Sequence, residues 1–164
     1  MYLNALEFLE EERDAWRPFE ALADVPDDRV DVEVEAAHGW TPRDLMSHLS
    51  AWQGYALEVA KELAVGEGSA TKQRLDAEWD RRGDAMNLDI QVEWRALPIE
   101  EVRLRFRETP GELRGYLTVV PETRWLKNAG MLHYFTDETI DHYADHETDL
   151  AAMVGPSAAP DAAR

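Results

Sequence analysis

The sequence predicts an all-α protein, a four-helix bundle with additional short helices. Apolar residues recur at three- and four-residue spacings over several long segments, and helix-start signals precede two of them. Strand-like alternation is confined to residues 31–35, and a lone strand has no partner to pair with. A length of 164 residues suits one domain with a substantial core. We assign residues 1–154 to that domain and expect residues 155–164 to form a disordered tail.

Composition excludes several classes of function. The 34 acidic and 17 basic residues give a net charge of −17, which repels phosphate groups, so we expect neither nucleic acid nor membrane as a partner. No apolar run approaches the roughly 18 residues of a membrane span. The N-terminal stretch lacks the basic flank and cleavage site of a signal peptide, which predicts a cytoplasmic protein. Because the chain contains no cysteine, any thiol chemistry requires an external thiol.

The first helix is expected over residues 2–23, where apolar side chains recur at helical spacing opposite an acidic face. Pro26, Asp27 and Asp28 are expected to end it. The segment 31–35 that follows, DVEVE, is interpreted as an extended connector.

A second helix is predicted over residues 42–65. Thr41 is a good N-cap, Pro42 suits the first helical position, and Asp44 lies in the positive first turn. The GEGS sequence at 66–69 ends the helix. Leucine, aromatic and valine side chains share a sector of about 120° with His48, so His48 is expected to face the core.

Two further helices are expected in the middle of the chain. Residues 71–97 have a helical pattern with Gly83 as a weak point. Pro98 then opens a helix that runs to about residue 120. Pro110 and Gly111 lie in its middle and are expected to kink or split it.

The C-terminal helix carries the most informative pair of residues. After a connection of uncertain form over residues 121–135, Thr136 is expected to cap a helix that Gly155 and Pro156 end. His142 and His146 lie one turn apart on the face that carries Thr139, Tyr143, Leu150 and Met153, whereas Asp141, Asp145, Glu147 and Asp149 are expected on the other side.

Three inward histidines predict a metal centre at His48, His142 and His146. Three imidazoles with an open position are typical of catalytic metal sites, and they suit zinc, nickel, copper or iron. The alternative is that these are core histidines with internal hydrogen-bond partners. The H-x-x-x-H spacing lacks the glutamate that follows the first histidine in metalloproteases; Tyr143 stands there, so peptide hydrolysis of that kind is not supported.

Four other residues have two possible interpretations. His38 and His133 are interpreted as loop histidines rather than ligands. Trp52, one turn after His48, is either a core residue or a wall of the substrate pocket. Asn87 either caps a local turn or faces the metal pocket. We include Trp52 and Asn87 as candidate substrate-binding residues.

Three segments resemble the DinB/YfiT-like superfamily: GWTPRDLMSHLSAWQGYA at 39–56, DAMNLDIQVEWRALPIEEVRLRFRE at 84–108 and TIDHYADHETDL at 139–150. They are most similar to the branch that contains mycothiol-dependent maleylpyruvate isomerase and the ClbS/DfsB proteins. The resemblance implies a DinB-like four-helix bundle with a divalent metal bound by His48, His142 and His146. It also implies a cytoplasmic, often dimeric protein, among whose relatives are thiol-dependent transferases and isomerases and a hydrolase that opens cyclopropanes.

These observations predict a metal-dependent enzyme that acts on a small-molecule substrate. With zinc or nickel bound, it would use an external low-molecular-weight thiol, mycothiol or bacillithiol, to attack an electrophile. A metal-dependent hydrolase of the ClbS type and a non-catalytic metal-binding stress-response protein are the alternatives. A homodimer is expected from the resemblance and from aromatic residues on the first and third helices that the core does not require.

Overall fold

The computed structural model describes residues 2–155, and within that range the chain is helical, which confirms the predicted all-α class. The one β feature of these residues is an isolated bridge between Val34 and Trp40. The predicted disordered tail, residues 155–164, lies outside the described part of the chain except for Gly155.

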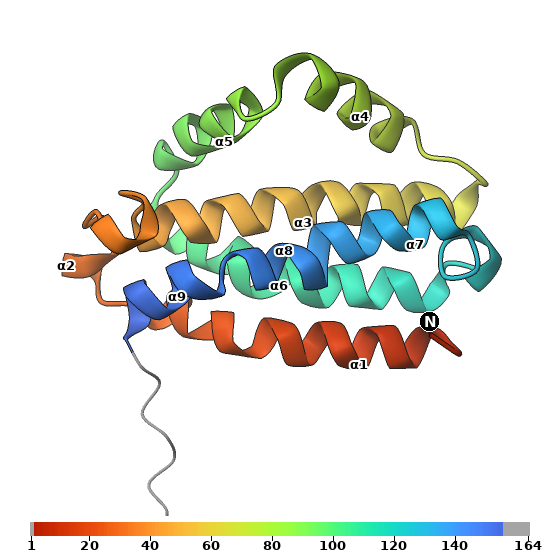
Figure 1. The fold of residues 1–164 in the computed structure, drawn as a ribbon, viewed down its shortest axis with the longest axis horizontal. Coiled ribbons are helices and arrows are strands. Elements are labelled where there is room, and N and C mark those ends of the chain that lie inside the picture. Colours follow the sequence, from red (N-terminus) through yellow and green to blue (C-terminus); the bar gives the residue numbers. More distant parts are fainter. Residues whose placement is uncertain (1, 156–164) are drawn as a thin grey trace, which may run out of the picture.

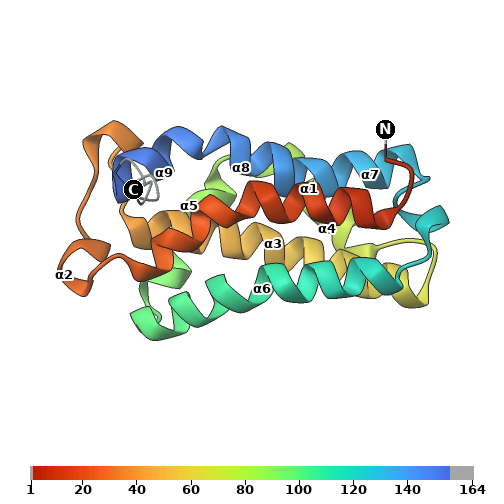
Figure 2. The ribbon, with the colours of Figure 1, turned by 90° about the horizontal axis from the view of Figure 1, so that it is seen from below.

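Four roughly parallel or antiparallel helical rods form the body of the molecule, and two helices arch over one side of it (Figures 1 and 2). The first three rods are α1 (Ala5–Trp16), α3 (Pro42–Val65) and α6 (Ile99–Val119). The fourth rod is composite and consists of α7 (Ala129–Thr136), the π-helical turn η4 (Asp137–Asp141), α8 (His142–Asp145) and α9 (Glu147–Val154). The arch over α3 consists of α4 (Ala70–Arg82) and α5 (Ala85–Arg95) (Figure 1).

The N-terminal segment differs from the single helix expected over residues 2–23. The α-helix α1 ends at Trp16, and the 3-10 helix η1 (Arg17–Asp24) continues it with Pro18 in its first turn. Proline has no N–H to donate and its ring clashes with the preceding turn, which accounts for the change of helix type.

The short segment before α3 also differs from the prediction. Residues Asp27–Val30 form the helix α2, so Pro26 and the two aspartates begin a helical turn as well as ending η1. The 3-10 turn η2 (Glu35–Ala37) interrupts the expected extended connector after Val34.

The helix α3 has the predicted bounds and the predicted start. The Thr41 hydroxyl accepts from the Asp44 backbone N–H, and the Asp44 carboxylate accepts from the Thr41 N–H, which makes a reciprocal capping box. The helix packs along α6 more extensively than any other pair of elements in the described residues. It therefore gives His48 a fixed position in the bundle.

The helix expected over 71–97 is two helices. Gly83 has φ 51° and ψ −130°, a conformation open to glycine and costly for other residues, and the chain turns there from α4 into α5. The weak point in the pattern is thus the apex of the arch in Figure 1.

The helix α6 is continuous through Pro110, so the predicted split does not occur. Pro98 is its N-cap and Ile99 its first residue, one position later than expected. Pro110 is buried, and its flanking helical turns pack on the core through Phe106 and Leu113. This packing on both sides of Pro110 explains why the helix continues despite the lost backbone hydrogen bond.

The connection 121–135 contains the 3-10 turn η3 (Glu122–Arg124) and the helix α7, which Asn128 caps. The prediction that Thr136 caps the last helix was therefore wrong. Thr136 lies inside the rod, where its hydroxyl donates to the Leu132 carbonyl. Asn128 is a residue of the usual N-cap type, but the α7 sequence after it is short and mostly apolar, so no helical periodicity marks the start of this helix.

The core has two apolar clusters, one toward each end of the bundle. In the first cluster the Trp16 ring packs 4.8 Å from Phe106 and 5.2 Å from Tyr143; in the second the Phe8 ring packs 5.2 Å from Trp125. The aromatic residues of α1 and η1 are thus core residues, and the expectation that they were spare for dimerisation was wrong.

Across residues 2–155, each helix is too short or too polar to pass through a bilayer.

Candidate metal centre

The three predicted ligands meet between α3 and the composite fourth rod. One nitrogen from each of His48, His142 and His146 lies within 4.8 Å of the other two. The His48 and His142 Nε2 atoms are 2.8 Å apart, and the ring centroids of the three histidines lie 4.8 to 5.2 Å from one another. Two nitrogens bound about 2.1 Å from one ion can be about 4.2 Å apart at most, so small side-chain rotations would place all three on one cation.

The backbone of the fourth rod departs from the α-helix on both sides of His142. The π-helical turn η4 precedes it, and such turns are frequent at functional sites because they rotate the side chains that follow. His146 has φ −104° and ψ 6°, a bridge conformation between α8 and α9. The two irregularities set the directions of the histidine side chains relative to His48.

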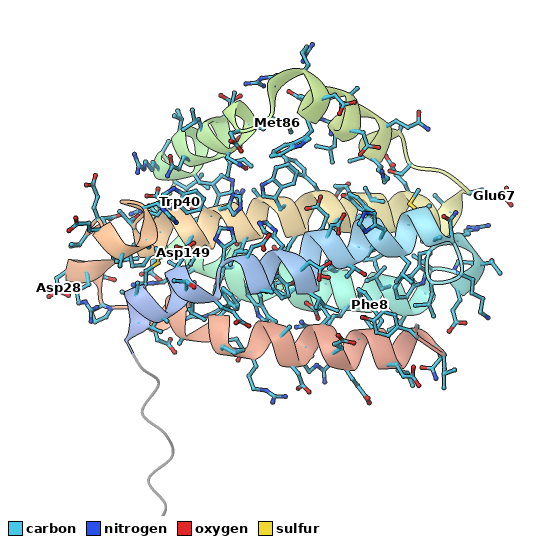
Figure 3. All side chains as sticks on the ribbon, in the orientation of Figure 1. Phe8, Asp28, Trp40, Glu67, Met86 and Asp149 are labelled. Atoms are coloured by element: carbon cyan, nitrogen blue, oxygen red, sulfur yellow. The ribbon has the colours of Figure 1, made fainter. Side chains whose placement is uncertain are left out.

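The His146 ring has two partners that orient it. His146 Nδ1 lies 2.8 Å from the Asp149 carboxylate, one turn further along the rod, and the ring stacks on Trp40 with centroids 5.7 Å apart. Figure 3 labels Trp40 and Asp149 toward the same end of the molecule. A carboxylate on the second ring nitrogen is the usual support of a metal-ligating histidine. Asp149 is buried, so its expected place on the outer face was wrong.

The His48 ring is more than nine-tenths buried, and its Nδ1 has no hydrogen-bond partner among the described residues. Burial and the neighbouring histidines lower the pKa of His48 to about 2, and burial and His146 lower the pKa of His142 to about 3. Both rings are therefore neutral at pH 7, as metal ligation requires. The Nε2 atoms of these two neutral rings face each other at 2.8 Å, with a nitrogen of His146 within 4.8 Å, and a shared metal ion fits this convergence of three imidazoles.

The three histidines line a cavity of about 700 Å³. Its walls come from α3 on one side, the α4–α5 arch on another and the fourth rod on the third, and side chains from the arch and from α3 extend into the space between them (Figure 3). The volume matches that of small-molecule sites. A bound ion would have protein ligands on one side and room for a substrate on the other, the arrangement of catalytic rather than structural metal sites.

Comparisons with known proteins leave the centre without a relative. No family model, curated protein or solved structure matches this chain. The geometry of the site is therefore the basis of its proposed chemistry.

The two candidate substrate-binding residues lie together on the cavity wall. The Trp52 Nε1–H donates to the Asn87 Oδ1 at 3.0 Å, which links α3 to α5. Trp52 also contacts the Trp79 ring edge-to-face at 5.6 Å, and all three side chains line the cavity. The indole of Trp52 is mostly buried, whereas Trp79 is 43% exposed.

One carboxyl group in the cavity has an altered pKa. Glu138 lies on η4, four residues before His142. Burial, and after it the Asp137 carboxylate, raise its pKa from 4.5 to about 8. A carboxyl group that titrates near neutral pH beside a candidate metal centre can both accept and donate a proton.

Glu138 and Asp149 were not identified from the sequence, although both carried a signal. Each lies within one turn of a predicted ligand, Glu138 at four residues before His142 and Asp149 at three residues after His146. The two histidines interpreted as loop residues do not join the centre. His38 is exposed with φ 58°, and His133, which lies in α7 rather than in a loop, lines the cavity with its Nδ1 3.2 Å from the Asp137 carboxylate.

Proposed function

We propose that this chain is a divalent-metal-dependent enzyme that transfers an external low-molecular-weight thiol to a small electrophile, or isomerises one through such an addition. The observation that carries the proposal is the meeting of three imidazoles, from two separate rods, in the wall of a cavity of about 700 Å³. The sequence resemblance to the DinB/YfiT-like superfamily and the helical bundle agree with this proposal, and we propose membership of that superfamily with it.

His48, His142 and His146 would hold the ion, and we propose zinc or nickel among the metals that three imidazoles suit. Bound there, the metal would supply Lewis acidity that lowers the pKa of a thiol or a water beside it. Mycothiol or bacillithiol would supply the sulfur, because the chain has no cysteine of its own.

Glu138 is the residue of this chain best placed to move a proton. The thiol S–H proton passes to its carboxylate as the sulfur forms a bond to the electrophilic carbon. The same carboxyl group then returns the proton to the atom that gained the electron pair. Trp52 offers the substrate an apolar wall, and Asn87 fixes the indole by accepting its N–H.

The second candidate is a metal-dependent hydrolase, and Glu138 also favours it. A carboxylate in the cavity can take the proton of a water molecule as the oxygen attacks an ester or a strained ring, with no thiol required. A non-catalytic metal-binding role needs no cavity beside the ligands and no titratable carboxyl in it, so the site geometry favours catalysis.

The test begins with protein purified without chelators and without a nickel column. Elemental analysis is expected to find close to one zinc or nickel ion per chain. The loaded protein is then assayed with a chromogenic electrophile in the presence of mycothiol, bacillithiol or no thiol, with His142→Ala as the control. Thiol-dependent turnover that the control lacks supports the transferase proposal. Turnover without thiol supports the hydrolase instead, and absence of both metal and turnover excludes the two.

A further inference from the structure

The cavity has acidic and aromatic walls and few cationic groups. Five carboxyl side chains line it: Asp76, Asp80, Asp137, Glu138 and Asp145. Apart from the three histidines of the centre, the basic residues along the described lining are Lys72 and His133, and no arginine is among them. Lys72 pairs with Asp76 at 2.7 Å and His133 with Asp137 at 3.2 Å, so each basic group already has a carboxylate in the same wall.

Three carboxyl groups have no such partner within residues 2–155. The structure gives no ion pair or side-chain hydrogen bond to Asp80, Glu138 or Asp145. Charged groups that enter a partly enclosed space need compensation, and no cationic side chain along the described lining of the metal-free cavity is free to compensate an anion, so the side chains make it a poor site for an anionic substrate.

Lys72 is an example of a cationic group that the cavity wall already binds. The Lys72 ammonium lies 5.1 Å from the centroid of the Tyr134 ring while it pairs with Asp76. A carboxylate and an aromatic face are the two features by which proteins bind organic ammonium groups. Trp79 and Trp52 continue the aromatic surface on the α4 and α3 sides of the same cavity.

We propose that the substrate of this site is an organic cation, a small electrophile that carries an amine or a quaternary ammonium group. Its charged end would lie against the Asp76, Asp80 and Trp79 side of α4, and its reactive end would face the three histidines. The inference rests on the proposed function, because it names the substrate class of that site.

The test compares two ligands of the same shape and different charge. Choline and its neutral isostere 3,3-dimethyl-1-butanol are titrated by NMR into metal-free and zinc-loaded protein. One charge about 7 Å from the ligand changes affinity about threefold in a water-like dielectric. Choline is therefore expected to bind the metal-free protein at least about threefold more tightly than the isostere. Zinc is itself a dication and is expected to reduce this preference, as is added salt.

Variants that remove negative or positive charge from the cavity show whether its side chains cause the preference for choline. The Asp76→Asn/Asp80→Asn variant is expected to bring the two affinities within about twofold. Lys72→Gln is expected to increase the preference for choline, because it frees the Asp76 carboxylate and the Tyr134 ring. The matched control is Glu108→Gln/Glu112→Gln, which removes two charges from exposed positions of α6 that do not line the cavity, and should leave the preference unchanged.

Equal affinities for the two ligands, or no detectable binding of either, would overturn the inference. So would an equal loss of preference in the α6 control, because net charge alone would then explain it. This test can fail or succeed independently of the proposed function, because the preference for choline is measured without metal and without turnover. A preference for choline in a protein that binds no metal would reject the proposed enzyme and keep the cation site.

Discussion

His142 connects the other two members of the centre. Its Nε2 lies 2.8 Å from that of His48, and its ring centroid lies 5.2 Å from that of His146. His142→Ala is expected to weaken zinc binding by at least about a hundredfold, because two imidazoles remain of three. The position is half-buried, so the far-ultraviolet circular dichroism should stay that of the parent. Isothermal titration with zinc measures the first effect, and a collapse of the helical signal would instead indicate a structural role.

Asp149 should act on the metal through His146. Its carboxylate fixes the orientation of the ring, and loss of such a partner costs about 10- to 100-fold in metal affinity. Asp149→Asn is expected to fall in that range by competition with a chelating dye. Glu147→Gln removes a charge from an exposed position two residues earlier and is the matched control. Equal losses of zinc affinity in the two variants would show that Asp149 acts through the net charge of the protein and not through its contact with His146.

Glu138 makes the stability of the metal-free protein depend on pH. With a folded pKa of about 8 against 4.5 in the unfolded chain, the folded state keeps a proton that the unfolded state has released between those values. The contribution of Glu138 to stability is thus fully present below pH 4.5 and is lost as pH rises through 8. Glu138→Gln is expected to match the parent at pH 5 and to exceed it at pH 9 by on the order of 1–3 kcal/mol. Urea unfolding at the two pH values tests this, and an unchanged difference would mean that Glu138 is ionised in the fold.

At the scale of elements, the arch depends on one backbone conformation. Gly83 joins α4 to α5 at φ 51° and ψ −130°, where an added Cβ meets no neighbour but the backbone itself is strained. Gly83→Ala is expected to cost about 1–3 kcal/mol. Gly115→Ala, in the interior of α6 with open space at the Cβ position, should gain about 0.5–1 kcal/mol. Thermal unfolding of both variants tests the contrast, and equal effects would contradict the assigned role of Gly83.

Sequence periodicity sufficed for the parts of the fold that obey one local rule. The bounds of α3 followed from Thr41, Pro42 and the glycines after Val65, and the inward face of α3 followed from the 3.6-residue repeat. The same repeat placed His142 and His146 on the buried side of the fourth rod. Local rules were enough there because capping and amphipathicity are properties of neighbouring residues.

Features set by tertiary packing could not be predicted in this way. The π-helical turn before His142 and the bridge conformation of His146 change the phase of the rod, so a wheel drawn at 100° per residue placed Asp149 on the outer face. Pro110 was expected to break a helix that its buried neighbours hold together. The cavity itself depends on how the arch lies over α3, and helical periodicity carries no information on that arrangement.

At the scale of the whole molecule, one buried polar chain crosses all four rods. The Gln53 amide of α3 donates to the Tyr143 hydroxyl of α8, and that hydroxyl donates to the Glu12 carboxylate of α1. Arg114 of α6 pairs with the other oxygen of Glu12 at 2.8 Å. Tyr143 follows His142 directly, so the chain of hydrogen bonds also fixes α8 against α3, the two elements that bring His48 and His142 together.

The buried charge of Glu12 should make the stability of the protein sensitive to the loss of its partner Arg114. The Glu12 side chain is 2% exposed, and Arg114→Met would leave its carboxylate buried without a cation. We expect Arg114→Met to lower the free energy of unfolding by about 3–5 kcal/mol. The double variant Glu12→Gln/Arg114→Met should recover most of that loss, because the introduced amide is neutral and its oxygen still accepts from the Tyr143 hydroxyl. Urea unfolding of the two single variants and the double variant gives the coupling energy. Additive losses would show that Glu12 and Arg114 do not interact, whereas recovery in the double variant would show that the cost is the uncompensated buried charge.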